Sequence, residues 1–146
     1  MTVDPQALKV LIIYSRETNE YLLPKGRKNV EETLEEAALR ETLEETGYKA
    51  TLLPLSIPTR ATSASPSASS LVTEPVCMSQ RETDGVLKVI FWFAAEADST
   101  TVELERPRQP GEENYETVWM SFDEAKSKIS FDDDREILKE VLKYTT

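Results

Sequence analysis

Each long apolar run in this chain of 146 residues has the length of a β-strand. The two longest runs, residues 8–14 and 86–95, fall far short of the roughly 20 apolar residues that a membrane-spanning helix needs. Short apolar runs bounded by turn residues favour a fold built on a β-sheet. Because the length is typical of one domain, we expect residues 1–146 to form a single domain.

Turn residues and apolar spacing divide the chain into expected elements. Strands are expected at residues 7–14, 21–23, 48–57, 76–80, 86–95 and 118–120, and the apolar strand at 86–95 is expected to be buried. Helices are expected at residues 31–46, 121–129, where Ser121 and Glu124 form a capping box, and 132–144. These elements predict an α+β fold, an α/β/α sandwich whose mixed sheet carries one helix on one side and the C-terminal helices.

Two segments lack the periodicity of strands and helices. Residues 58–70 consist mainly of Ser, Ala, Thr and Pro, which is typical of a mobile surface loop. Residues 96–117 are polar and interrupted by prolines and a glycine, so we expect a second long loop there.

The composition excludes several classes of function. A net charge of -10 argues against non-specific nucleic-acid binding, which depends on Lys and Arg. The absence of histidine excludes Ser-His-Asp and Cys-His nucleophile systems and His-ligated zinc. The single cysteine, Cys77, excludes an intrachain disulfide and a thiolate zinc cluster, and without a partner base we expect it to be buried or idle. Catalysis would therefore rest on carboxylates, Lys, Arg, Tyr, Ser or a hard metal ion.

The first residues give an expectation about location. The start, Met-Thr-Val-Asp-Pro, lacks the basic region and following apolar stretch of a secretory signal. We therefore expect a cytoplasmic protein, with no membrane partner. A secreted protein whose leader has been removed would have the same start.

The helix expected over residues 31–46 carries a large excess of acidic side chains. Against one base, Arg40, stand Glu31, Glu32, Glu35, Glu36, Glu41, Glu44 and Glu45. Like charges four residues apart on a helix repel by roughly 0.2–0.5 kcal/mol per pair, so a purely structural helix would intersperse the signs. At about 100° per residue, Glu41, Glu44 and Glu45 share one face. Such a face offers the oxygen ligands that Mg²⁺ prefers.

The segment before this helix has the opposite charge. Lys25, Arg27 and Lys28 surround Gly26, and a glycine lets the backbone approach a ligand closely. On one interpretation the loop binds phosphate next to a metal ion. On the other, the three cations only neutralise the acidic start of the helix. Composition alone does not decide between the two.

Loop and helix together form a known pattern. The run Gly26, five residues, Glu32, seven residues, Arg40-Glu41-Thr42-Leu43-Glu44-Glu45-Thr46-Gly47-Tyr48 resembles the Nudix box, G-x5-E-x7-R-E-U-x-E-E-x-G-U, where U is a bulky aliphatic residue. Every charged and glycine position agrees. Thr42 and Tyr48 replace aliphatic residues, which affects packing rather than the carboxylate face. A weaker resemblance to the C-terminal half of the family's sandwich extends over residues 86–125.

The resemblance implies attack of water on one phosphorus of a nucleoside diphosphate linked to another moiety, with Mg²⁺ or Mn²⁺ as cofactor. Glu41, Glu44 and Glu45 would hold the metal ion, and one of them, with Glu44 as the candidate, would also act as general base. Arg40 would orient the glutamates, and Glu32 would support them or bind a further ion. A hard metal ion activates water near neutral pH, so the missing histidine is no obstacle.

Relatives often add an acidic residue from the loop before the last strand. Glu113 and Glu116 are the candidates in this chain, and plain solvation of an acidic loop is the alternative. Arg60 and Arg81 are candidates for further phosphate contacts, although surface solubility explains both equally well.

The segment Leu23-Pro24-Lys25-Gly26 resembles one found in diadenosine polyphosphate and diphosphoinositol polyphosphate hydrolases. The expected substrate is therefore a small molecule of one of these two classes. An aromatic pair from Tyr115, Trp92 and Phe93 would favour dinucleoside polyphosphates, but Trp92 and Phe93 also suit a core. The alternatives are ADP-ribose or another linked nucleoside diphosphate, an mRNA cap, and a non-catalytic ligand-binding domain. Sequence does not predict the oligomeric state.

Overall fold

The computed structural model describes residues 1–58, 71–105 and 108–145. The expected loop at 58–70 lies outside these residues except for Pro58, and so does Arg60. The strands are β1 Thr2–Asp4, β2 Lys9–Ser15, β3 Glu20–Leu22, β4 Thr51–Leu52, β5 Cys77–Thr83, β6 Val86–Trp92, β7 Ala95–Glu96 and β8 Tyr115–Ser121. The helices are α1 Leu34–Thr46, α2 Phe122–Lys128 and α3 Asp132–Thr145.

Strand β2 forms the centre of a six-stranded mixed sheet. It pairs antiparallel with β8 along its whole length, and with β1 and β3 through the residues at its two ends. β7 pairs parallel with β1, and β4 antiparallel with β7, which gives the order β3-β2-β1-β7-β4. The residues Val10, Leu11, Ile12 and Ile13 are almost fully buried. Because successive side chains of a strand point to opposite faces, both faces of the sheet are covered.

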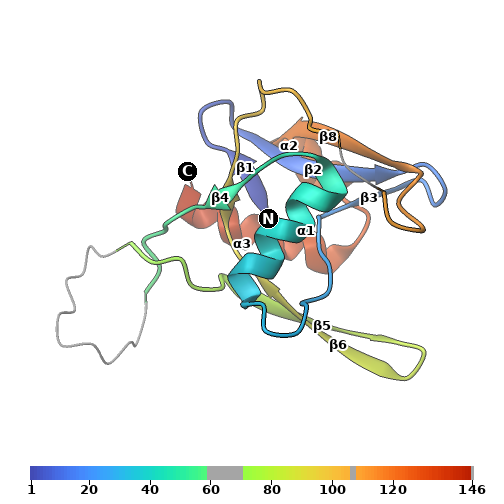
Figure 1. Cartoon of the computed structure of the whole chain (residues 1–146). Coiled ribbons are helices and arrows are strands. Elements are labelled where there is room, and N and C mark those ends of the chain that lie inside the picture. Colours follow the sequence, from blue (N-terminus) through green and yellow to red (C-terminus); the bar gives the residue numbers. More distant parts are fainter. Residues whose placement is uncertain (59–70, 106–107, 146) are drawn as a thin grey trace.

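The helices supply this cover. In Figure 1, α1 lies in front of the sheet, and α2 and α3 lie behind it. The apolar face of α3 enters the core with Val10 and Ile12 through Ile137, Leu138, Val141 and Leu142. The predicted α+β sandwich is confirmed. Among the described residues, no helix is long and apolar enough to cross a membrane.

The helix predicted over residues 31–46 begins three residues later than expected. Thr33 is its N-cap, because the Thr33 side chain accepts a hydrogen bond from the Glu36 amide while the Glu36 carboxylate accepts one from the Thr33 amide. Glu31 and Glu32 therefore belong to the preceding loop. The predicted end is confirmed, since Gly47 adopts the left-handed conformation with a φ of 77°.

Two strand predictions are wrong in extent or burial. The strand predicted over 48–57 is reduced to β4, because its partner β7 offers only two residues for pairing. The strand predicted to be buried over 86–95 ends at Trp92, and most of it is exposed; Leu87 is 62% exposed. It forms a hairpin with β5 that extends beyond the sandwich, as Figure 1 shows. Apolar composition alone does not reveal that a hairpin projects.

The turn after β1 depends on a buried carboxylate, Asp4. It accepts hydrogen bonds from the amides of Gln6, Ala7 and Ser99 at 3.0, 2.9 and 2.8 Å. Burial alone would raise the pKa of Asp4, but the Ser99 side chain together with these amide bonds outweighs burial and lowers the pKa to about 2. Because the folded pKa lies below the ordinary value of 3.8, the stability that Asp4 contributes is present above that value and is lost as the pH falls toward 2.

We expect Asp4→Asn to lower the free energy of unfolding at pH 7 by about 1–3 kcal/mol, because hydrogen bonds to a charged acceptor are replaced by weaker ones. The difference from the wild type should shrink as the pH falls from 4 toward 2. Urea unfolding at a series of pH values checks this. A difference that stays constant over that range would contradict the role given to Asp4.

Candidate active site

The basic loop after β3 lies directly on the carboxylate face of α1. The amide of Lys25 donates to Glu45 Oε2 at 2.8 Å, and Arg40 Nη2 donates to the carbonyl of Arg27 at 2.8 Å. At Gly26 an added Cβ would lie 1.9 Å from the Glu41 Cδ. The backbone of Gly26 is outside the left-handed region, so space rather than torsion demands glycine here.

This contact predicts the effect of a single methyl group. Gly26→Ala should lower kcat/KM by about 10–100-fold, because the loop and the Glu41 carboxylate must separate. Gly85→Ala is the control, since a Cβ there meets nothing within 4 Å and only strains the turn between β5 and β6. Steady-state kinetics of both variants measure the loss of kcat/KM, and thermal unfolding shows whether each variant is still folded. Equal kcat/KM in Gly26→Ala and wild type would show that the loop does not need its present position.

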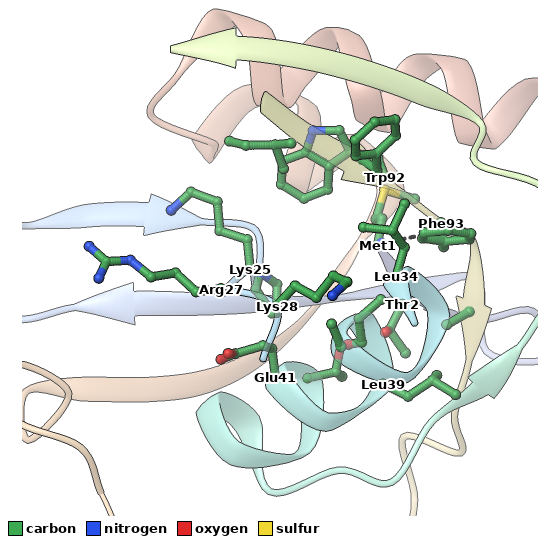
Figure 2. Close-up of a pocket in the computed structure, with 18 of the residues that line it drawn as sticks. Met1, Thr2, Lys25, Arg27, Lys28, Leu34, Leu39, Glu41, Trp92 and Phe93 are labelled. Carbon is green, nitrogen blue, oxygen red and sulfur yellow. Dashed lines mark hydrogen bonds between the residues drawn. The ribbon is translucent and has the colours of Figure 1, made fainter. Parts of the chain in front are cut away.

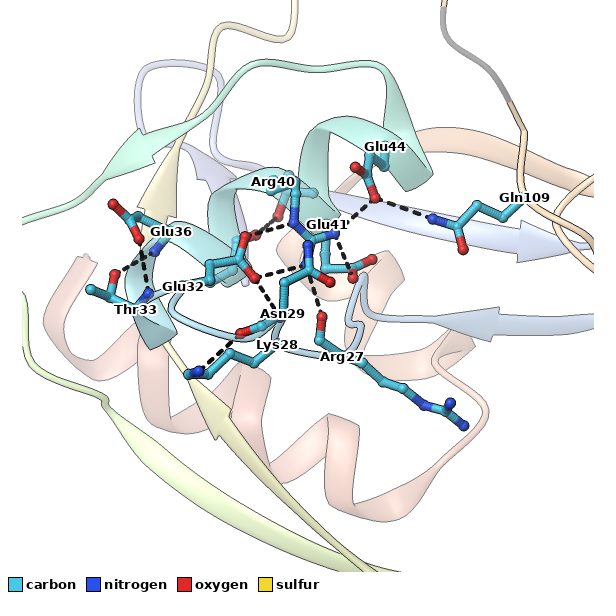
Figure 3. Close-up of polar contacts among 12 residues, drawn as sticks. Arg27, Lys28, Asn29, Glu32, Thr33, Glu36, Arg40, Glu41, Glu44 and Gln109 are labelled. Atoms are coloured by element: carbon cyan, nitrogen blue, oxygen red, sulfur yellow. Dashed lines mark hydrogen bonds and ion pairs between the residues drawn. The ribbon is translucent and has the colours of Figure 1, made fainter.

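Arg40 is the centre of a cluster of carboxylates (Figure 3). Its Nε donates to Glu32 Oε1 at 2.7 Å, and its Nη1 donates to Glu41 Oε1 at 2.8 Å and Glu44 Oε2 at 2.9 Å. The hydrogen bonds with Glu32 raise the pKa of Arg40 further above its ordinary value. The same contact lowers the pKa of Glu32 to about 2. Arg40 therefore keeps these three acids together and Glu32 ionised.

The pKa of Glu45 is shifted in the opposite direction to the pKa of Glu32. Burial raises the pKa of Glu45 to about 8, while the hydrogen bond from the Lys25 amide and the Lys25 charge act against this rise. The charges of Glu112 and Glu41 raise the pKa of Glu45 further. Glu45 is thus a desolvated acid in an acidic neighbourhood, a place where a cation would be favoured.

The donor set fits a hard divalent cation. Carboxylate oxygens are the ligands that Mg²⁺ and Mn²⁺ prefer. Within the part of the chain that the structure describes, no three acidic side chains are arranged as a ready-made metal site. Arg40 lies between Glu32, Glu41 and Glu44, so a cation would compete with its guanidinium group for Glu41 and Glu44.

A cavity of about 800 Å³ opens between the basic loop, α1 and the hairpin (Figure 2). One side is formed by residues 24–28, and Glu41 lies at its edge. The opposite side is formed by Phe91, Trp92 and other apolar residues of β6, among which Lys88 is the cationic exception. The cavity therefore joins a cationic wall to an apolar and aromatic one.

Several predicted site residues have other contacts. Glu113 accepts a hydrogen bond from the Gly111 amide at 2.8 Å, and Glu116 forms an ion pair with Arg16. Arg81, a candidate for phosphate contact, pairs with acidic residues at the start of α3 and is not among the residues that line the cavity.

The cationic loop and two of the aromatic candidates contribute to the cavity. Lys25, Arg27 and Lys28 line the cavity, although the Arg27 guanidinium points away from the carboxylates in Figure 3. Trp92 and Phe93 are core residues that also line the cavity.

Sequence reasoning missed two residues of the polar loop that precedes β8. Glu112 is close enough to raise the pKa of both Glu45 and Tyr115. Gln109 Nε2 approaches Glu44 Oε2 at 3.4 Å. Nothing in the sequence distinguishes Glu112 from its acidic neighbours, because the loop's contacts depend on how it folds back over α1.

The two departures from the Nudix box are accommodated by packing. Thr42 is buried, and its hydroxyl donates to the Ala38 carbonyl at 2.8 Å. The ring of Tyr48 packs edge-on against Trp119 with 5.4 Å between the ring centroids. Neither residue contributes to the Arg40 cluster, so the departures leave the carboxylate face unchanged.

Curated proteins are similar to this chain in sequence. One, named 8-oxo-(d)GTP phosphatase, from Mycolicibacterium smegmatis, is 28% identical over 142 residues, which cover 97% of this chain and 36% of that protein. Nudix hydrolase 4 of Arabidopsis thaliana is 44% identical over 45 residues, which cover 31% of this chain and 22% of that protein. The chain thus spans well under half the length of either relative.

Solved structures share the fold. A hydrolase of the NUDIX family from Clostridium perfringens has a TM-score of 0.62 and 23% identity, with 94% of this chain and 86% of that chain covered. The Ap4A hydrolase of C. elegans has a TM-score of 0.59 and 18% identity, with 91% and 83% covered. A family model described as the NUDIX domain matches residues 3–141, and the chain therefore belongs to the NUDIX domain family.

Proposed function

We propose that this chain hydrolyses a phosphoanhydride bond in a polyphosphorylated small molecule, with Mg²⁺ or Mn²⁺ as cofactor. The observation that carries the proposal is the convergence of Glu32, Glu41 and Glu44 on Arg40 beside a basic loop. Membership of a family with hydrolase relatives supports the same reaction class. Glu41, Glu44 and Glu45 would hold the ion, with Glu32 in support.

The carboxylates differ in how well they can reach a water molecule. When bound, the cation would neutralise phosphate charge and make an attacking water more acidic. The side chain of Glu44 is 34% exposed, whereas that of Glu41 is 11% exposed. Glu44 is therefore the better candidate for the general base that takes the proton from water. Arg40 orients Glu44 and Glu41, and Lys25, Arg27 and Lys28 offer positive charge to the phosphates.

The cavity favours a purine nucleoside polyphosphate, with diadenosine polyphosphates as the proposed substrates. A nucleobase is flat and largely apolar, so it suits the wall that contains Phe91 and Trp92, while the phosphates suit the cationic loop. A diphosphoinositol polyphosphate carries charge around its whole ring and leaves the apolar wall without a partner. The 28% identity to a protein named 8-oxo-(d)GTP phosphatase makes oxidised guanine nucleotides a second candidate.

A comparison of rates tests this proposal. Diadenosine tetraphosphate, 8-oxo-dGTP, ADP-ribose, diphosphoinositol pentakisphosphate and capped RNA are incubated separately with the protein and Mg²⁺ or Mn²⁺, and kcat/KM is measured for each. We expect one of the two purine polyphosphates to exceed the inositol compound by about tenfold or more. The highest kcat/KM on the inositol compound would contradict the substrate class. No turnover of any compound would favour a non-catalytic ligand-binding domain.

A further inference from the structure

We propose that Asp134 and Arg81 are positioning residues that fix the two walls of the active-site cavity relative to each other. One wall is the basic loop 24–28, and the other is the hairpin formed by β5 and β6. The inference rests on the proposed function, since it concerns how the same cavity binds its substrate. Neither side chain is among the residues that line the cavity.

Asp134 lies in the first turn of α3 and is deeply buried, with a side chain that is only 2% exposed. Arg81 Nη2 donates to its Oδ1 at 2.6 Å. The backbone of Leu23 lies close enough to the same carboxylate to act against the rise of its pKa. Burial raises the pKa of Asp134, and the charge of Arg81 acts against that rise. One buried carboxylate thus joins α3 to β5 and lies beside the residue that follows β3.

The contact with Leu23 leads to the first wall. Leu23 comes immediately before Pro24 and the basic loop, so the Asp134 carboxylate lies beside the point where that loop begins. Tyr21 strengthens the same connection, because its amide donates to Ser130 Oγ at 2.8 Å and its carbonyl accepts from the Ser130 amide at 3.0 Å. Ser130, which precedes α3, therefore holds β3 in place.

The contact with Arg81 leads to the second wall. Arg81 on β5 lies directly opposite Lys88 on β6, and Lys88 lines the cavity. Arg81 Nε also donates to Asp133 Oδ2 at 2.8 Å, and its guanidinium lies 5.4 Å from the centre of the Phe131 ring. A two-stranded hairpin is only marginally stable by itself in water, so its position depends on such anchoring contacts.

The carboxylates of α1 are held separately, by Arg40. Loosening the connection between the two walls should therefore weaken substrate binding. The groups that would perform the chemistry should stay unchanged. The kinetic sign of such a role is a raised KM with an unchanged kcat.

The test must avoid leaving a buried charge alone. Removing Arg81 by itself leaves the Asp134 carboxylate without its partner and destabilises the fold. The double variant Arg81→Met/Asp134→Asn removes both charges and keeps a polar side chain of the same size at position 134. Asp133→Asn is the matched control, because Asp133 is the more exposed of the two acidic partners of Arg81.

In the double variant we expect KM for diadenosine tetraphosphate, or for the best substrate of the wild type, to rise about fivefold or more while kcat stays within about twofold. Arg81→Lys, which keeps a charge but not the planar fork, should give an intermediate KM. Asp133→Asn should stay close to the wild type. An unchanged KM in the folded double variant, or a fall in kcat alone, would overturn the proposal.

A second readout does not depend on turnover. Hydrogen exchange measured by NMR should be faster for hairpin amides in the double variant, and unchanged for the amides of α1. Wild-type exchange in the hairpin would overturn the proposal even if the enzyme proved inactive. Absence of turnover in the wild type would instead count against the proposed function, and exchange alone would then decide this inference.

Discussion

Glu44→Gln is expected to lower kcat by about 10²–10⁴-fold, which is the range typical of removing a general base. The amide has the size of the carboxylate and can still accept the hydrogen bond from Arg40, but it cannot take a proton from water. It also binds a divalent cation more weakly, because it carries no charge. The measurement is kcat with the best substrate at saturating Mg²⁺, alongside circular dichroism and thermal unfolding.

Glu35→Gln is the matched control for this experiment. It makes the same chemical change in the first turn of the same helix, outside the Arg40 cluster. Its kcat should stay within about twofold of the wild type. Wild-type kcat in Glu44→Gln would refute the role of Glu44, and an equal loss in Glu35→Gln would show that the helix, rather than the base, had been damaged.

Arg40→Lys should lower kcat/KM by about 10–100-fold, the usual effect of losing a residue that orients metal ligands. Lysine offers a point charge, whereas the guanidinium group of Arg40 reaches Glu32, Glu41 and Glu44 at the same time. The three carboxylates would then repel one another. Because a cation relieves that repulsion, raising the Mg²⁺ concentration should restore part of the lost rate.

The measurement for Arg40→Lys is a Mg²⁺ titration of kcat/KM beside the wild type. A changed Mg²⁺ dependence is a result that general destabilisation would not produce. Identical titration curves for the two proteins would show that Arg40 does not organise the carboxylates.

The parts of the fold that the sequence predicts well depend on local signals. The end of α1 at Gly47 follows from the glycine itself, and the capping box of Ser121 and Glu124 starts α2 as expected. The parallel pairing of β1 with β7 joins residues more than 90 positions apart, and no local pattern indicates it. The exposure of β6 also depends on distant contacts. An apolar strand is predicted to be buried, but β6 pairs only with β5 and does not join the main sheet.

The candidate site also combines features that follow from local spacing with contacts between distant elements. Helical spacing predicts that Glu41, Glu44 and Glu45 share one face of a helix, because that is a property of the helix alone. The inclusion of Glu32 in the Arg40 cluster requires the loop before Thr33 to turn back toward the helix, and only the structure shows that turn. Glu112 and Asp134 act across distant elements. Spacing patterns carry no information about contacts of that kind.

Metal dependence of hydrolysis is the most direct test of the function proposed for this chain. The protein is first treated with a chelator, and the initial rate on diadenosine tetraphosphate and 8-oxo-dGTP is then measured while Mg²⁺ or Mn²⁺ is added. We predict no hydrolysis without the ion and a saturable return of the rate with it, with a final rate about 10²–10⁴-fold lower in Glu44→Gln. Hydrolysis that continues at full rate in excess chelator would contradict the central role given to the glutamates of α1.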